Sequence, residues 1–397
     1  MKFIIAALVI VSSLFAAKVV NVEEKFQKSE SCKACHMHIV SDWEKSWHAK
    51  SHYKSDEYFK ATTDYVSRKT RKSLNSVKVQ CATCHNPRIS VTSTDMDYEI
   101  AAVMGLDKGS DVNKALESDA INEGINCVVC HNIDKIHTSK DESKRGINRV
   151  EWTKSGLMSG PYDDAKSPYH KVEHRDFMDK KSDQLCFVCH ANDRSVSGMV
   201  FTDMKKEYKK KGKEGCVDCH MGPKKMGIAA TLPIDGGKVK KRIVRSHKFE
   251  GAHMANILKD SLSLKLSQKG ENLLVTISNP QPHNVPSGFG ARELVLEVSY
   301  QKGIENLDTK FISLTTHYTS KRGKPTIPHL AVKATKDLSI PAKGKRVIKV
   351  AKNSDASNVE VKLYYRLVNE EVRKILKLKG ETWSRKTLIT SERLILQ

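Results

Sequence analysis

The sequence has no cysteine outside five short motifs and no long apolar run after residue 17. A membrane-spanning helix needs about 18 or more apolar residues in succession, so we expect no span in the rest of the chain. A protein of 397 residues is long enough to build a core without covalent staples. These two absences exclude a disulfide framework and a membrane span beyond the N-terminus.

All ten cysteines lie in five copies of the motif Cys-x-x-Cys-His. The copies are CKACH (Cys32, Cys35, His36), CATCH (Cys81, Cys84, His85), CVVCH (Cys127, Cys130, His131), CFVCH (Cys186, Cys189, His190) and CVDCH (Cys216, Cys219, His220). This pattern is the attachment signature of c-type haem. The two thiols add across the vinyl groups of one porphyrin, and the adjacent histidine becomes the proximal iron ligand. Structural zinc would need paired knuckles that converge on one metal, so the sequence predicts five covalently bound haem c groups.

The first 17 residues combine Lys2, an apolar stretch and small residues at Ala16 and Ala17. This arrangement predicts a cleaved signal peptide at 1–17, with an uncleaved anchor as the alternative. No cysteine follows closely enough for lipid attachment. We therefore expect an exported, periplasmic protein, with an extracellular or anchored location as alternatives. Export agrees with haem attachment, which takes place on the outer side of a bacterial cytoplasmic membrane.

The formal net charge of +22 would also fit a nucleic-acid-binding protein. Each haem brings two propionates, so five haems would lower the charge to roughly +12 when reduced and about +17 when oxidised. The lysines are scattered along the chain rather than aligned, and nucleic acid is not expected as a partner. The basic surface instead favours docking of acidic redox proteins, and association into an oligomer or a membrane complex stays open.

Two regions of the chain differ in pattern. Residues 25–255 hold all the motifs, separated by polar and charged segments, so the porphyrins must supply much of the apolar volume of this domain. Residues 256–397 contain short segments in which apolar and polar residues alternate, at 261–267, 272–279, 293–300, 311–318, 345–352 and 359–368. This alternation predicts an antiparallel β-sandwich with a late helix at 369–379 and a closing strand. The predicted fold class is α+β, with a helical and irregular haem domain followed by the sandwich.

Histidine is more abundant than the five proximal positions require. Eleven histidines remain: His38, His48, His52, His137, His170, His174, His247, His253, His283, His317 and His329. Methionine as the second axial ligand raises the haem potential, whereas two histidines give a low potential. The surplus of histidine therefore favours a low-potential chain of bis-histidine haems.

The segment CKACHMHIVSDWEKSWHAKSH resembles the opening of multihaem cytochromes c related to the tetrahaem electron carrier of ammonia oxidation and to hydroxylamine oxidoreductase. In those proteins the first motif is followed by W-x-x-S-x-H-A, whose histidine is a distal ligand. Trp43, Ser46, His48 and Ala49 match that element. The resemblance implies that His48 is a distal ligand, with His52 as the competing choice one helical turn further on.

Three further segments resemble the same group. SPYHKVEH, ahead of the fourth motif, nominates His170, with His174 as the alternative. SHKFEGAHM, after the fifth motif, nominates His247 and His253. NPQPHNVPSGFGARELVLEV is similar to the element that opens the β-domain in several multihaem cytochromes, and it nominates His283. The implied distal ligands are thus His48, His170, His247, His253 and His283.

The remaining histidines fit less well as distal ligands. His38 is too close to its own proximal histidine to reach the other haem face, and His137 stays open. His317 and His329 are expected to be surface or loop residues.

Five distal ligands for five irons leave no position for a substrate, so the sequence favours an electron carrier. The first alternative is an enzyme that acts on a small nitrogen or sulfur compound at one five-coordinate haem. Pentahaem nitrite reductases mark such a haem with lysine in CxxCK, and every motif here ends in histidine. The second alternative makes the β-sandwich a module for docking or assembly.

Overall fold

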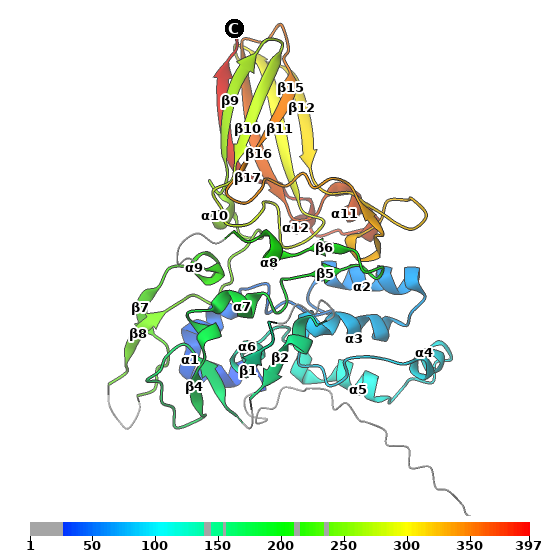
Figure 1. The fold of residues 1–397 in the computed structure, drawn as a ribbon, viewed down its shortest axis with the longest axis vertical. Coiled ribbons are helices and arrows are strands. Elements are labelled where there is room, and N and C mark those ends of the chain that lie inside the picture. Colours follow the sequence, from blue (N-terminus) through cyan, green and yellow to red (C-terminus); the bar gives the residue numbers. More distant parts are fainter. Residues whose placement is uncertain (1–26, 139–143, 154–155, 210–214, 234–237) are drawn as a thin grey trace, which may run out of the picture.

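The computed structural model describes residues 27–397 apart from 139–143, 154–155, 210–214 and 234–237. The predicted signal peptide at 1–17 lies outside the described residues. A tall bundle of strands stands on a broader part made of helices and short strand pairs, and the chain ends at the far tip of the bundle (Figure 1). In the described ranges, we find no helix of the length and apolar character that a bilayer crossing requires.

The part that holds the haem motifs is built from short helices. In chain order they are α1 (Ser29–Glu44), α2 (Glu57–Thr70), α3 (Leu74–His85), α4 (Met96–Val103), α5 (Asp111–Glu117), α6 (Cys127–His131), α7 (Ser182–Cys186), α8 (Met204–Glu207), α9 (Cys216–His220) and α10 (Ala255–Leu258). Several begin at a polar side chain that accepts a free amide of the first turn. Asp56 accepts from the Phe59 amide at 3.0 Å at the start of α2. Ser73 does the same for α3. Such caps stabilise helices that are too short to be stable alone.

Four two-stranded sheets lie among these helices. They pair β1 (Ile133–Ile136) with β2 (Val150–Trp152), β3 (Met158–Gly160) with β4 (Val172–His174), β5 (Asp193–Arg194) with β6 (Val200–Thr202), and β7 (Lys225–Ile228) with β8 (Lys241–Val244). The buried apolar clusters of this part are small, and one of them includes Ile133, Val188 and the motif residue Cys189. The haem motifs therefore lie directly beside the small apolar clusters that form the core of this part.

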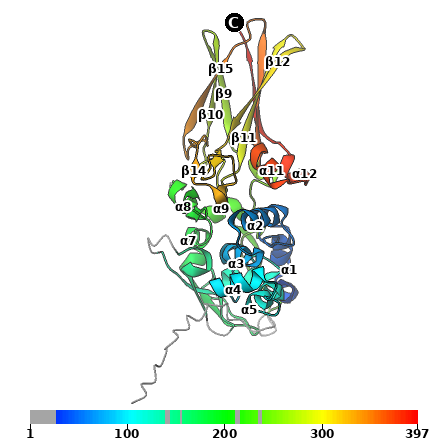
Figure 2. The same ribbon diagram turned by 90° about the vertical axis from the view of Figure 1, so that its right-hand side faces the viewer.

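The C-terminal part is an antiparallel β-sandwich, as the alternation of residues predicts. One sheet has the order β15 (Lys345–Ala351), β10 (Asn272–Ser278), β9 (Ser263–Lys269), and the other has β12 (Glu305–Leu314), β11 (Glu293–Lys302), β16 (Asn358–Arg366), β17 (Thr387–Ile395). Figure 2 shows the two sheets edge on. Every second residue of β10 and of β16 is buried, and the two inner faces share one apolar cluster that includes Val275 and Leu296.

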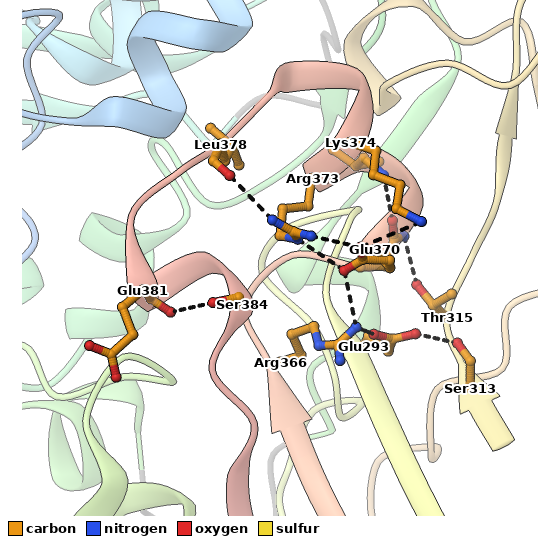
Figure 3. A network of polar contacts seen from close by, with 12 residues as sticks. Glu293, Ser313, Thr315, Arg366, Glu370, Arg373, Lys374, Leu378, Glu381 and Ser384 are labelled. Carbon is orange, nitrogen blue, oxygen red and sulfur yellow. Dashed lines mark hydrogen bonds and ion pairs between the residues drawn. The ribbon is translucent and has the colours of Figure 1, made fainter. Parts of the chain in front are cut away.

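The predicted α+β class is confirmed, and the late helix is present as α11 (Glu370–Leu376). Figure 3 shows the polar network that holds α11 on the sandwich. Arg366 on β16 contacts Glu293 at 3.2 Å and Glu370 at 3.8 Å. Glu370 also pairs with Arg373 at 2.7 Å. These contacts fix the first turn of α11 against the start of β11.

The sandwich is joined to the haem-motif part by α2, α11 and α12 (Glu381–Ser384). The Glu57 carboxylate at the start of α2 accepts from the Lys379 amide and from Trp383 Nε1, both at 2.8 Å. An apolar cluster crosses the same boundary, with Val66 and Val77 on one side and Val372 on the other. The predicted boundary at 255–256 falls at the first residue of α10, and the division into two domains stays a prediction.

Candidate haem sites

Each Cys-x-x-Cys-His motif lies in or at the end of a short helix. The third and fifth motifs are themselves the helices α6 and α9, and the second motif ends α3 at His85. Cysteines three positions apart share one face of a helix, and the histidine follows within the same turn. In the first, second, third and fifth motifs, which are helical, the local structure therefore points both thiols and the histidine to one side.

Four proximal histidines face a second histidine from a distant part of the chain. The distances between ring centroids are 6.4 Å for His36 and His170, 6.3 Å for His190 and His48, 6.3 Å for His131 and His247, and 6.2 Å for His220 and His283. An iron held between two imidazoles needs two metal–nitrogen bonds of about 2.0 Å, and each ring centroid lies about 1.1 Å beyond its nitrogen, which gives about 6.2 Å in all. The spacing of these four pairs fits one bis-histidine haem iron each.

Hydrogen bonds to the other ring nitrogen orient several of these rings. The Nδ1 atoms of His36, His131 and His220 lie 2.6, 2.7 and 2.5 Å from the carbonyl oxygens of Ala229, Ser159 and Glu250. His283 Nδ1 lies 2.8 Å from the Asn284 carbonyl oxygen. A donated Nδ1–H leaves Nε2 with its lone pair, which is the form and the atom that commonly bind a metal.

Burial keeps three of the paired imidazoles neutral, those of His48, His190 and His247. It lowers the pKa of His48 to about 3 and the pKa of His190 and His247 to about 4. A protonated imidazole has no lone pair for the metal. At neutral pH these side chains are therefore ready to coordinate iron.

His85 has a different environment. Its Nδ1 lies 3.0 Å from Ser51 Oγ, and the Phe59 ring stacks on it with a centroid distance of 4.4 Å. Within the described ranges, Phe59 is the ring partner that the structure gives to His85. The second motif is thus the one whose proximal histidine lacks a facing histidine at the spacing of the other four.

The nominated His253 lies elsewhere. Its ring packs on Trp47 with a centroid distance of 5.0 Å, and its Nε2 is buried without a hydrogen-bond partner. The structure therefore brings four of the five nominated distal histidines to a proximal histidine and does not bring His253 to one. As distal ligands, all five stay predictions.

The competing histidines have other contacts. His52 is buried, and its Nδ1 accepts from the Lys54 amide at 3.2 Å. His174 lies 3.2 Å from Asp163, and His137 lies 2.6 Å from Glu151. His38 and His317 are exposed. His329 does lie in a loop, but it is less exposed than the sequence suggests, because its Nδ1 is buried and lacks a hydrogen-bond partner.

Thiols of different motifs touch one another. Cys32 contacts Cys127, Cys84 contacts Cys189, and Cys186 contacts Cys216. These are contacts of the first motif with the third, the second with the fourth, and the fourth with the fifth. The attachment points of these motifs therefore lie side by side.

Comparisons with known proteins bear on the fold that carries these motifs. Residues 67–231 match the family described as outer membrane cytochrome MtrC/MtrF-like, domains II/IV. The structure is similar to that of a penta-heme cytochrome c552 from Thermochromatium tepidum, with a TM-score of 0.68, 21% sequence identity, and coverage of 93% of this chain and 98% of that chain. The chain has the fold of a multihaem c-type cytochrome. Haem c is the cofactor that this fold and the Cys-x-x-Cys-His motifs support.

Two further matches are partial. A superoxide reductase in the oxidised state is 9% identical over 35% of this chain and 89% of its own, with a TM-score of 0.18. A structural genomics target, SoR45, is 14% identical over 34% of this chain and 88% of its own, with a TM-score of 0.13. Both values are too low to carry an argument about the cytochrome. No curated protein sequence matches the chain.

Proposed function

We propose that this cytochrome holds five covalently bound haem c groups and passes electrons through them between redox partners outside the cytoplasm. The observation that carries the proposal is the set of four histidine pairs with centroid distances between 6.2 and 6.4 Å. An iron with two imidazole ligands has no position for a substrate, and its low potential suits electron transfer. Bound haem would supply the one-electron chemistry, and the chain supplies ligation, burial and orientation.

The contacts between thiols support an order for the haems, numbered here by motif. Because each thiol attaches to a porphyrin edge, touching thiols imply neighbouring haems. Haems 1 and 3 are then neighbours through Cys32 and Cys127, and haems 4 and 5 through Cys186 and Cys216. Cys130 is also close enough to Cys186 for their charges to interact. We infer a row in the order 1, 3, 4, 5, with haem 2 branching from haem 4.

The fifth motif is the favoured point of exchange with a partner. Cys219 is the exposed thiol among the ten, all of which lie in the described ranges. Lys224 and Lys225 follow on the surface, and Lys224 lies 3.9 Å from Asp179. A porphyrin edge near solvent and beside basic residues suits an acidic redox protein.

The enzyme alternative has one specific observation in its favour. The ring of His85 faces Phe59 and has no facing histidine at 6.2–6.4 Å among the residues that the structure describes. If the iron there had five ligands, a small nitrogen or sulfur compound could bind at the sixth position. The likeness to ammonia-oxidation cytochromes and to hydroxylamine oxidoreductase, which include carriers and enzymes, stays a prediction.

A ferric-state electron paramagnetic resonance spectrum, recorded with and without nitrite, hydroxylamine, sulfite or cyanide, tests the proposed function. Five low-spin haems that none of these compounds changes support the carrier. One high-spin haem that binds them supports the enzyme. A mass equal to that of the bare processed polypeptide, or the absence of a Soret band, contradicts haem binding altogether.

His283→Ala tests the pairing that crosses from the sandwich to the fifth motif. The variant should convert one low-spin haem to high-spin, because it removes the ring 6.2 Å from His220. The matched control is His317→Ala, which removes an exposed histidine of the same part of the chain, 3.5 Å from Glu371. An unchanged spectrum for His283→Ala would remove His283 from the ligands.

A further inference from the structure

The second motif is the place where the histidine pairing is incomplete. Two histidines have a buried ring nitrogen without a hydrogen-bond partner, namely His253 at Nε2 and His329 at Nδ1. Such a nitrogen is costly inside a protein unless it gains a partner, and a metal ion bound to that nitrogen is one such partner. These two side chains are the candidates for the iron that His85 holds.

His329 lies in the apolar surroundings of the second motif. It is in the short 3-10 turn Pro328–Leu330, which is part of the loop between β13 (Tyr318–Thr319) and β14 (Lys333–Ala334). Ile327 and Leu330, on either side, belong to the same apolar cluster as Cys81, the first thiol of the second motif. The His329 ring lies 4.9 Å from Phe201 and 6.4 Å from Phe289, which packs on that cluster as well.

The backbone around His329 is anchored on the haem-motif part. The carbonyl oxygen of His329 accepts from the Val196 amide at 2.8 Å. The carbonyl oxygen of Ala331 accepts from the Ser197 hydroxyl at 2.6 Å. Both donors lie between β5 and β6, which follow the fourth motif. These two hydrogen bonds therefore hold the loop beside the fourth motif, whose Cys189 contacts Cys84 of the second.

Electrostatic neighbours separate the two candidates. In each of the four ring pairs, the charge of one histidine is close enough to act on the other. Burial is the main reason why the pKa of His85 is lowered, and its charged neighbours are Asp56, Asp193 and His329. The charged neighbours of His253 are Arg292 and Lys50. His253 also acts on His48, but His48 already faces His190.

We propose that His329 is the distal ligand of the iron held by His85. This inference rests on the proposed haem at the second motif. His329 and His283 then make the C-terminal part the source of the sixth ligand for two of the five haems. The sandwich is, on this basis, an integral part of the haem protein, because two of its loops complete iron sites in the other part of the chain.

The test compares His329→Ala with the matched variant His253→Ala in the full-length haem protein. The haem content per chain is measured first, from the pyridine haemochrome and the mass, because fewer than five haems in the wild type would count against the proposed function alone. We expect His329→Ala to convert one low-spin haem to high-spin, and His253→Ala to leave all five low-spin. The opposite pattern would assign the site to His253 and overturn the inference.

Two further variants at the same position distinguish loss of an iron ligand from a general effect on folding. In His329→Gly, added imidazole should restore the lost low-spin signal, because a free ring can occupy the position of the missing side chain. His329→Met should keep the haem low-spin and raise the potential of one haem, since a thioether ligand raises it. A high-spin haem in the wild type, or a His329→Gly protein that ignores imidazole, would overturn the inference.

Discussion

Gly146 shows how closely two haem motifs approach one another. It begins the 3-10 turn Gly146–Arg149 with a φ of +52°, and its amide donates to the Val188 carbonyl of the fourth motif at 2.8 Å. A Cβ atom at this position would collide with the backbone carbonyl of Thr83 and would lie 2.9 Å from Cys84 Sγ, both in the second motif. Only glycine fits between the two motifs without moving one of them.

The first prediction concerns this contact. Gly146→Ala should lower the free energy of unfolding by about 2–4 kcal/mol, because it adds a collision with backbone to the cost of a left-handed φ. The matched control is Gly198→Ala, whose φ is +85° and whose Cβ would meet nothing within 4 Å, so it should cost only about 1 kcal/mol. Thermal unfolding midpoints and haem content of the two variants give the comparison. Equal losses would contradict the close approach.

Glu207 gives a prediction about pH. It lies at the end of α8, where it accepts a hydrogen bond from the Ser287 hydroxyl, and burial raises its pKa from 4.5 to about 7, with Asp337 and Asp203 adding to the rise. The folded protein binds this proton more tightly than the unfolded chain does. The contribution of protonated Glu207 to the free energy of unfolding is therefore complete below pH 4.5 and is lost as the pH rises toward about 7.

Glu207→Gln should remove this part of the pH dependence, because the amide cannot ionise. Unfolding midpoints measured between pH 4.5 and pH 7 should fall for the wild type and stay flatter for the variant. The exposed residue Glu305 provides the control, since Glu305→Gln should follow the wild-type curve. Parallel curves for the wild type and Glu207→Gln would show that another group is responsible.

At the scale of elements, the contact between α2 and α12 joins the two parts of the molecule. Glu57 caps the amides of Lys379 and Gly380 and binds the Trp383 indole. Hydrogen bonds to a charged group are worth more than neutral ones, but the exposure of Glu57 reduces their value. Glu57→Ala should therefore lower the free energy of unfolding by about 1–2 kcal/mol.

Glu57→Ala should also increase local opening at the contact between α2 and α12 more than in the sandwich itself. Hydrogen exchange should rise at the amides of Lys379 and Gly380 and should stay low in β10 and β11, which are paired on both sides. Glu381→Ala is a suitable control, because the Glu381 side chain is exposed on the neighbouring helix. Similar exchange in both variants would mean that Glu57 does not hold the junction.

Elements of the sandwich were largely predictable because their pattern is local. Alternation over 272–279 and 359–368 matches β10 and β16 closely, since one face of each strand is buried and the other is not. β12 begins at Glu305 rather than near 311. Its first residues pair with the end of β11, although they are polar and show no alternation. The start of β12 is decided by its hydrogen bonds to β11, and the residue pattern of β12 alone does not contain that information.

For the whole molecule, the net charge of +22, which five haems would lower to roughly +12 when reduced and about +17 when oxidised, predicts a strong effect of salt on electron transfer. The rate with an acidic redox protein should fall as the ionic strength rises from about 0.01 M to about 0.15 M, because the Debye length shrinks from about 30 Å to about 8 Å. The rate with an uncharged small mediator should change little over the same range. Stopped-flow spectroscopy of haem oxidation measures both rates, and equal salt effects would contradict electrostatic docking.

The sequence alone determined the positions at which haem attachment is predicted. Two thiols and a histidine within five residues form an attachment site by themselves, because their spacing on one helical turn matches one porphyrin, as in α6 and α9. It also determined the sandwich, because strand alternation is a property of neighbouring residues.

Only the tertiary structure decided which histidine faces which motif. His48 comes shortly after the first motif and yet faces His190 of the fourth, while His36 faces His170. His329 looked like an ordinary loop residue and is enclosed beside Phe201. Two imidazoles about 6 Å apart are placed by the packing of separate segments of the chain, and no local pattern of residues carries that information.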